Sequence, residues 1–402
     1  MDANKPELLI PAGDTEKLRN AVLFGADAVY LGAGPYSLRA QATSFNLDEL
    51  QQAIKFCHEH QVKVYLAMNI FAFDEDLSKM IEYLKSAIEI GIDGVIISDP
   101  GVLSLIRKLN TKVKIHLSTQ TNTINSEAVK FWREQGIKRV VLGREVSLAQ
   151  AKEIKSNVPD IELELFVHGA MCISYSGRCL LSKHMTGRSA NRGECTQPCR
   201  WKYRLKEVSR PDEEFSIEED GRGTYIMNSK DLCMVEYLPE LVNAGIDSFK
   251  VEGRMKSPYY VALVTKIYRQ AINAKGFDPR WKEELLKISH RQYTTGFYFG
   301  DADRENIAGG ACIRDYNFVG VVESWDPKTR QLEIKARNYF GQGDTLEIID
   351  PQAQDIKKIR INKIRTDQNE EITEAHNDYH VFASLDTTDM ISKYSLLRRK
   401  RQ

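Results

Sequence analysis

The sequence has no net charge and no long apolar run. Its 56 basic and 56 acidic side chains cancel over 402 residues. Bulk charge therefore gives it no attraction for a polyanion, and any nucleic acid must bind a local patch. None of its apolar runs reaches the roughly 18 residues that a membrane span needs. Residues 1–13 lack a basic stretch followed by an apolar one, so we expect no secretory signal, no membrane association and a cytoplasmic location.

The number of cysteines in the sequence is odd. There are seven, and because no export signal is expected we predict reduced thiols rather than a disulfide framework. Cys57 and Cys312 stand alone, and for these two we expect small, buried apolar side chains. The other five lie close together in the chain and are Cys172, Cys179, Cys195, Cys199 and Cys233. This grouping indicates a specific role for them.

Short apolar runs alternate with amphipathic helical stretches over the first part of the chain. Each run is almost continuously apolar, which is typical of parallel strands covered on both faces. The eight runs are 7–13, 27–32, 63–69, 93–99, 114–120, 139–145, 162–169 and 248–254. Eight βα units predict an α/β fold, a (β/α)8 barrel of the TIM type. A doubly wound open sheet is the structural alternative.

The spacing of the runs also predicts the domain organisation. The barrel is expected over 1–275, but the connection between its seventh and eighth strands, 170–245, is too long for a simple βα unit and predicts a cysteine-rich insertion above the barrel mouth. The last part of that insertion, 229–245, is expected to be a helix. After a linker helix at 276–295, short alternating strands over 296–402 predict a small all-β barrel domain that ends in a basic tail.

The predicted strands end in polar or glycine residues, and active sites of such barrels lie at the carboxyl ends of the strands. We expect substrate-binding residues at Asn69, Gln120 and Arg144, and catalytic residues at His168, Glu252 and Arg254. His168 could act as an acid or base near neutral pH, or simply cap its strand. Glu252 and Arg254 point to the same side of one strand, so they either pair with each other or grip a polar substrate.

The cysteines at 172, 179, 195 and 199 follow the spacing C-x6-C-x15-C-x3-C. Thiolates are soft ligands, and four of them in one irregular segment suit either zinc or an iron–sulfur cluster. The paired C-x2-C knuckles of zinc ribbons are absent, which favours a cluster. Spacing alone does not decide which four ligate, because Cys233 is a fifth candidate. Unligated thiols that are merely neighbours in the chain are the remaining alternative.

The same segment is strongly basic. Its cations are Arg178, Lys183, Arg188, Arg192, Arg200, Lys202 and Arg204, and its aromatic residues are Tyr175, Trp201 and Tyr203. Arginine binds phosphate through two hydrogen bonds and aromatic rings stack on unpaired bases, so Arg178, Arg200 and Trp201 are candidates for an RNA-facing surface. The alternative is a solvated loop whose cations anchor acidic loops nearby.

Several motifs resemble one known family. They are ELFVHGAMCISYSGRCLLS (164–182), NRGECTQPCRW (191–201), YIMNSKDLC (225–233), FKVEGRMKSPYY (249–260), PELLIPAG (6–13) and GADAVYLG (25–32). Together they resemble the collagenase-like peptidase family, group U32, over the whole chain. The resemblance implies a (β/α)8 barrel that holds a [4Fe–4S] cluster through Cys172, Cys179, Cys195 and Cys199, with Cys233 as the alternative ligand, and that hydroxylates its substrate without oxygen.

Within that family the sequence is most similar to members that convert the wobble uridine of tRNA to 5-hydroxyuridine with prephenate as co-substrate. The resemblance therefore implies an iron–sulfur tRNA uridine hydroxylase. We expect the basic insertion to bind the anticodon arm, with help from the basic tail, and Arg144 and Arg254 to bind the carboxylates of the co-substrate. The alternatives are a collagenase-like peptidase and a non-catalytic RNA-binding module, although the H-E-x-x-H and G-x-S-x-G protease motifs are absent. Whether a protein partner takes part is left open.

Overall fold

The structure is a computed structural model. It describes residues 5–38, 45–172, 174–201, 219–220, 223–224, 230–274, 276–300 and 313–401. Cys312 and residues 202–204 of the basic segment, which the sequence analysis singled out, lie outside these ranges.

Eight parallel strands form a closed barrel. They are β1 (Glu7–Pro11), β2 (Ala28–Gly32), β3 (Lys63–Met68), β4 (Gly94–Ile97), β5 (Lys114–Leu117), β6 (Arg139–Val141), β7 (Glu162–Ala170) and β11 (Ser248–Val251). Ser248 of β11 pairs with Glu7 of β1 on one side and with Glu164 of β7 on the other. Because the last strand is hydrogen-bonded to both the first and the seventh, the barrel prediction is confirmed and the open-sheet alternative is wrong.

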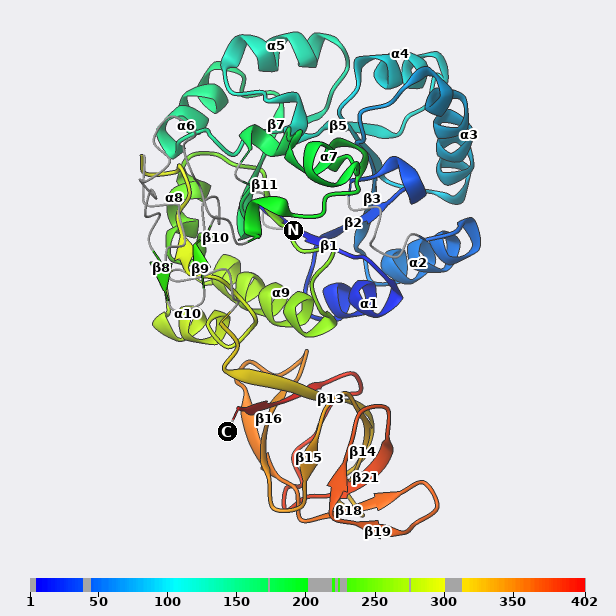
Figure 1. Cartoon of the computed structure of the whole chain (residues 1–402), viewed down its shortest axis with the longest axis vertical. Coiled ribbons are helices and arrows are strands. Elements are labelled where there is room, and N and C mark those ends of the chain that lie inside the picture. The colour runs from blue at the N-terminus through cyan, green and yellow to red at the C-terminus, as the bar shows by residue number, and fades with distance from the viewer. Residues whose placement is uncertain are drawn as a thin grey trace, which may run out of the picture.

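Helices surround the barrel (Figure 1). They are α1 (Thr15–Leu23), α2 (Leu47–Glu59), α3 (Asp74–Ile90), α4 (Pro100–Lys108), α5 (Ser126–Glu134), α6 (Leu148–Asn157), α8 (Leu238–Asn243) and α9 (Pro258–Asn273). Local sequence explains where several begin: the side chains of Asp14, Asn46 and Ser257 accept hydrogen bonds from backbone N–H groups of the first helical turn. No helix in the described ranges combines the length and the apolar composition that crossing a bilayer requires.

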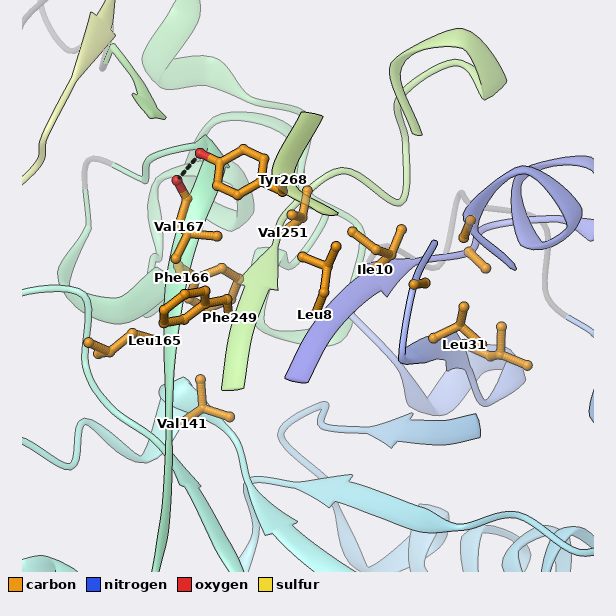
Figure 2. Close-up of a cluster of buried hydrophobic side chains, with 14 of the residues drawn as sticks. Leu8, Ile10, Leu31, Val141, Leu165, Phe166, Val167, Phe249, Val251 and Tyr268 are labelled. Carbon is orange, nitrogen blue, oxygen red and sulfur yellow. Dashed lines mark hydrogen bonds between the residues drawn. The ribbon is translucent and has the colours of Figure 1, made fainter. Parts of the chain in front are cut away.

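The main core lies between the strands and the helices. Leu8, Ile10 and Val251 are among its buried residues, and Figure 2 shows them with neighbouring apolar side chains. In the same figure the hydroxyl of Tyr268, from α9, donates to the carbonyl of Val167 in β7 over 2.8 Å. Strand residues of the opposite parity face the barrel interior. This packing holds the strand ends, and therefore the groups that follow them, in fixed positions.

The insertion follows β7 and crosses the barrel mouth, where α7 lies over the centre of the helix ring in Figure 1. Its described elements are η3 (Tyr175–Gly177), α7 (Leu181–Thr186), η4 (Ala190–Arg192), η5 (Pro198–Arg200), β8 (Glu219–Asp220), β9 (Gly223–Thr224), β10 (Asp231–Cys233) and η6 (Val235–Tyr237). The predicted helix at 229–245 is only partly correct. Residues 231–233 form a strand because β7 extends beyond the rim and β10 pairs antiparallel with that extension; β12 (Tyr293–Thr294) then pairs with β10.

A second, all-β domain follows α10 (Pro279–Leu285), as the sequence predicted. It is an antiparallel sheet with the order β17-β16-β22-β13-β14-β21-β18-β19 and a small extra pair, β15 and β20. The strands are β13 (Tyr316–Asp326), β14 (Gln331–Ala336), β15 (Phe340–Gly341), β16 (Thr345–Ile349), β17 (Lys357–Arg360), β18 (Lys363–Thr366), β19 (Glu371–Ile372), β20 (Glu374–Ala375), β21 (His380–Ser384) and β22 (Leu396–Lys400). Val319, Leu332 and Ile334 belong to its own buried core.

The expected basic tail is instead the strand β22, which lies between β16 and β13. The Arg398 side chain is fully buried and forms ion pairs with Glu347 of the same sheet (2.6 Å) and Glu284 of α10 (2.5 Å). A buried guanidinium paired in this way cannot also contact RNA. Arg398 is therefore not available to bind an anticodon arm and instead links the second domain to α10, while RNA binding by the rest of the basic tail stays a prediction.

Candidate functional site

A cavity of about 130 Å³ lies at the carboxyl end of the barrel strands. Its floor is built from barrel residues and its upper wall from the insertion. The lining includes Tyr30, Asn69, Ile96, Ser118, Gln120, Arg144, Phe166, Cys172, Ser176, Cys179, Cys195, Cys199, Lys250, Glu252 and Arg254. The structure thus brings five of the predicted strand-end residues and four cysteines to one partly open cavity.

The four thiols of Cys172, Cys179, Cys195 and Cys199 all face this cavity and form no disulfide. Burial raises the pKa of the Cys199 thiol, and the nearby thiols of the other three add to this increase while Arg200 opposes it. Within the described part of the chain, no three His, Cys, Asp or Glu side chains are arranged to hold a single metal ion. The four sulfur atoms therefore share a cavity without forming a ready-made site for one ion.

Cys233, the fifth candidate, lies elsewhere. It is buried in β10, where its sulfur is 4.0 Å from the Tyr268 hydroxyl, and burial raises its pKa to about 11. It is not among the residues that line the cavity. Cys57 is fully buried in α2, as expected for an apolar side chain.

Asn69 and Gln120 are joined through one hydroxyl on the cavity wall. The Asn69 side-chain amide donates to Ser118 Oγ (3.3 Å), which in turn donates to Gln120 Oε1 (3.2 Å). Gln120 is 2% exposed, and its Nε2 has no hydrogen-bond partner. A buried N–H without an acceptor costs free energy, so this amide is available to donate to an occupant of the cavity.

Arg144 and Arg254 lie on the same wall. Arg144 donates from Nη1 to the carbonyl of Ala170 (3.1 Å), its guanidinium carbon is 4.0 Å from the centre of the Phe166 ring, and its buried Nε has no partner. Arg254 is almost fully buried and donates to Ser37 Oγ (2.6 Å). A Cβ at Gly32, the last residue of β2, would lie 2.5 Å from the Arg254 guanidinium. Glycine at that position therefore makes room for the cation.

Glu252 is positioned by the backbone of the neighbouring strand. Its N–H donates to the carbonyl of His168 (2.8 Å), and its own carbonyl accepts from the Tyr260 hydroxyl (2.9 Å). Gly169 has a φ of 110°, and a Cβ there would collide with the Glu252 carbonyl. The glycine after His168 is thus required both for its backbone conformation and for the close approach of the two strands.

His168 does not lie on the cavity wall. Pairing between β7 and β11 passes from Phe166 to His168 and skips Val167, whose carbonyl accepts from Tyr268. This extra residue changes the alternation, as a β-bulge does. The His168 ring packs among Tyr260, Tyr268 and Tyr293, and burial lowers its pKa to about 3. A buried neutral imidazole outside the cavity favours the second of the two roles that we considered, that of a structural residue at the strand end, and the acid–base role stays a prediction.

Sequence reasoning missed Lys250 and Glu164. Lys250 lines the cavity and its ammonium lies 2.8 Å from the Glu164 carboxylate, which also accepts from Arg139 (3.2 Å). The signal was present in the sequence, because polar residues alternate at 248, 250, 252 and 254 within the eighth strand and its end. In a barrel this alternation indicates a polar interior face.

The contacts of the basic segment are within the protein where the structure gives them, and the RNA-facing role stays a prediction. Arg192 forms an ion pair with Asp76 (2.7 Å), which is the anchoring role. Arg178 donates from Nε to the carbonyl of Gln120 (2.8 Å), and Arg200 donates to Gln197 (2.7 Å). Trp201 is 41% exposed. Arg178, Arg200 and Trp201 are outside the cavity lining, so any contact with RNA through them would be at the rim.

The fold and site define a two-domain protein: a parallel barrel whose mouth holds a thiol-rich polar cavity, followed by an antiparallel sheet domain. Residues 13–308 match the sequence model of "Peptidase family U32", and residues 314–398 match that of the "Peptidase family U32 C-terminal domain". The chain therefore belongs to peptidase family U32, as its motifs suggested.

Three relatives show the range of names in this family. The chain is 42% identical over 359 residues to the tRNA hydroxylation protein P1 of Bacillus subtilis, covering 87% of this chain and 85% of the relative. It is 35% identical over 395 residues to the 23S rRNA 5-hydroxycytidine C2501 synthase of Escherichia coli, covering 94% and 58%. It is 32% identical over 394 residues to a collagenase of Porphyromonas gingivalis, covering 90% and 91%.

Proposed function

We propose that this protein is an iron–sulfur RNA-modifying enzyme that hydroxylates the wobble uridine of tRNA to 5-hydroxyuridine, without oxygen and with prephenate as co-substrate. The observation that carries the proposal is the convergence of four free thiols and a set of hydrogen-bond donors on one cavity at the barrel mouth. The names of the relatives support RNA hydroxylation as the reaction class.

The donor set suits an iron–sulfur cluster, because thiolates are soft ligands and four of them line one cavity. The paired C-x2-C knuckles that are typical of zinc ribbons are absent from the sequence, which favours a cluster over zinc. Cys172, Cys179, Cys195 and Cys199 would hold the cluster. When bound, it supplies redox and Lewis-acid chemistry at the wall of the cavity.

The barrel side of the cavity suits a small organic acid. The Nε2 of Gln120 and the Nε of Arg144 are buried donors without acceptors, and the Lys250 ammonium lies on the floor. Glu252 is the one carboxylate among the lining residues. Buried donors that outnumber acceptors favour a ligand with carboxylate oxygens, which is the chemistry of prephenate.

RNA would approach across the rim of the cavity. Trp201 and Tyr175 are exposed aromatic side chains of the insertion, and Phe73, which precedes α3, is 61% exposed with the Arg192 guanidinium 5.1 Å from its ring centre. Unpaired bases stack on such rings. An enzyme that modifies C5 of a pyrimidine must take the base out of its stack, so we infer that the target base enters the cavity from this rim.

The test compares cysteine variants of the full-length protein. We expect Cys172→Ser and Cys179→Ser to abolish iron and sulfide binding after anaerobic reconstitution, and to abolish 5-hydroxyuridine in tRNA when they replace the wild-type gene. Cys57→Ala, which removes a thiol far from the cavity, is the matched control and should keep both. Cys233→Ala should also keep iron. Retained tRNA hydroxylation in the Cys172 or Cys179 variant would refute the proposal.

The same preparations distinguish the other functions. Turnover of gelatin by the reconstituted protein, lost on changing a single cavity residue, would establish a peptidase. Tight tRNA binding with unchanged nucleoside mass spectra in a deletion strain would establish a non-catalytic RNA-binding module.

A further inference from the structure

Ser176 has an unusual backbone conformation in the segment that carries two of the cavity cysteines. It lies between Cys172 and Cys179, is 4% exposed and lines the cavity. Its φ is 43° and its ψ 32°, in the left-handed region. That region is unfavourable for residues other than glycine, and they occupy it only where the surroundings impose it.

The carboxylate of Glu145 satisfies both donors of Ser176. The Ser176 backbone N–H donates to Glu145 Oε1 and its hydroxyl donates to Oε2, each over 2.6 Å. Glu145 follows β6 in the loop to α6, so it is attached to the rigid barrel. Gly143, in the same loop, leaves space for this contact: a Cβ there would lie 3.1 Å from Oε2 and 3.3 Å from Ser176 Oγ.

We propose that Glu145 is a positioning residue, which clamps residues 174–179 onto the barrel and so keeps the neighbouring Cys172 and Cys179 on the cavity wall. Hydrogen bonds to an ionised acceptor are about twice as strong as those between neutral groups, and two of them offset the strain at Ser176. Elsewhere in this turn the Gly177 N–H donates to the Ser174 carbonyl (3.1 Å), and Arg178 Nε donates to the Gln120 carbonyl (2.8 Å). The clamp is the contact that ties Ser176 itself to a barrel strand end.

If Glu145 acts in this way, a second substitution at Ser176 should reverse the effect of removing its carboxylate. Removing the carboxylate in Glu145→Ala lets Ser176 leave the left-handed region, so the segment shifts. Glycine occupies that region at little cost, and the double variant Glu145→Ala with Ser176→Gly should therefore recover much of the native arrangement. A carboxylate that contributes only to global stability would show no such rescue.

The experiment measures the alkylation rate of Cys179 by iodoacetamide in metal-free protein. The alkylation rate does not depend on the proposed cluster, because the protein is metal-free. Only the measurement of iron binding rests on the proposed function. We expect Glu145→Ala to raise the rate about tenfold, the order of the left-handed penalty, and the double variant to reverse at least half of that change. Iron and sulfide content after reconstitution should fall in Glu145→Ala and recover in the double variant.

Two controls complete the design. Glu153→Ala removes an exposed carboxylate of α6 and should match the wild type. Glu145→Gln keeps an acceptor for the Ser176 N–H and offers its amide to the hydroxyl, so it should stay near the wild type even if the alanine variant fails to fold. The inference is overturned if Cys179 is alkylated at the same rate in Glu145→Ala as in Glu153→Ala, or if Ser176→Gly does not lower the rate of Glu145→Ala. It is also overturned if Glu145→Gln raises the rate as much as Glu145→Ala. If the alkylation rates of the variants change as expected but the wild-type protein binds no iron, the proposed function alone is refuted.

Discussion

The ammonium of Lys250 lies 2.8 Å from the carboxylate of Glu164, beneath the cavity and inside the barrel. Glu164 is completely buried and Lys250 is 5% exposed. The carboxylate also pairs with Arg139, which pairs in turn with Glu7 at the start of β1 (2.5 Å). The lower barrel is therefore filled by alternating charges, and the last cation of this series forms part of the cavity floor.

Removing one member of this series should destabilise the barrel. Glu164→Gln removes the carboxylate that pairs with Lys250 and one of the carboxylates that pair with Arg139, and breaking a buried ion pair in this way costs about 3–5 kcal/mol. Urea unfolding at neutral pH measures the loss. The double variant Glu164→Gln with Lys250→Met removes one of the two cations and should recover part of it. A Glu164→Gln protein as stable as the wild type would contradict this account of the interior.

His168 should make the protein less stable as the pH falls. Burial lowers its pKa from 6.5 to about 3, so the folded protein keeps the ring neutral while the unfolded chain takes up a proton. The stability from this group is present above pH 6.5 and is lost as the pH falls toward 3, at up to roughly 1.4 kcal/mol per pH unit. His168→Gln should reduce this slope in urea titrations, although His116, with a pKa lowered in the same direction, keeps part of it. His184→Gln, on the exposed face of α7, is the control and should leave the slope unchanged.

Trp201 should contribute to RNA binding at the cavity rim. Loss of one base-stacking platform costs about 1–3 kcal/mol, so Trp201→Ala should weaken binding of tRNA about tenfold in a filter-binding assay at fixed salt. Phe131→Ala removes another exposed ring (53%, against 41% for Trp201) from α5 on the barrel exterior and should leave binding unchanged. Equal affinity in the two variants would place RNA elsewhere on the protein.

The basic C-terminus should behave as a structural strand. Deleting residues 398–402 removes most of β22, which separates β16 from β13 in the sheet. We expect the truncated protein to lose the cooperative unfolding of its second domain in calorimetry. Arg398→Met should lower the stability by about 3 kcal/mol because Glu284 and Glu347 lose their buried partner. A truncated protein that unfolds like the full chain would restore the interpretation of a free tail.

Local patterns in the sequence were sufficient for the architecture. Continuous apolar runs of parallel strands are visible without tertiary information, because both faces of each strand are buried. Seven of the eight predicted runs contain the whole of the corresponding barrel strand, and the run 162–169 ends one residue before the end of β7. The polar residues that end these runs were found for the same reason, and Asn69, Gln120, Arg144, Glu252 and Arg254 lie together on the cavity wall.

The features that the sequence did not reveal depend on contacts between distant segments. His168 lies outside the cavity lining because the pairing of β7 with β11 skips Val167, and a strand register depends on two segments at once. Arg398 was read as a tail residue because its partners, Glu284 and Glu347, are far away in the chain. The sequence shows that residue 398 carries a charge, but it does not show which carboxylates pair with it.

The sequence by itself determined the barrel, the second all-β domain and the family, since each depends on local periodicity or on contiguous motifs. Only the tertiary structure decided which side chains share the cavity: it placed the thiols at 172, 179, 195 and 199 there, left Cys233 in β10, and added Lys250 to the floor. The physical reason is that burial and pairing are properties of the closed barrel. They arise only when strands and insertion segments far apart in the chain come together around one space.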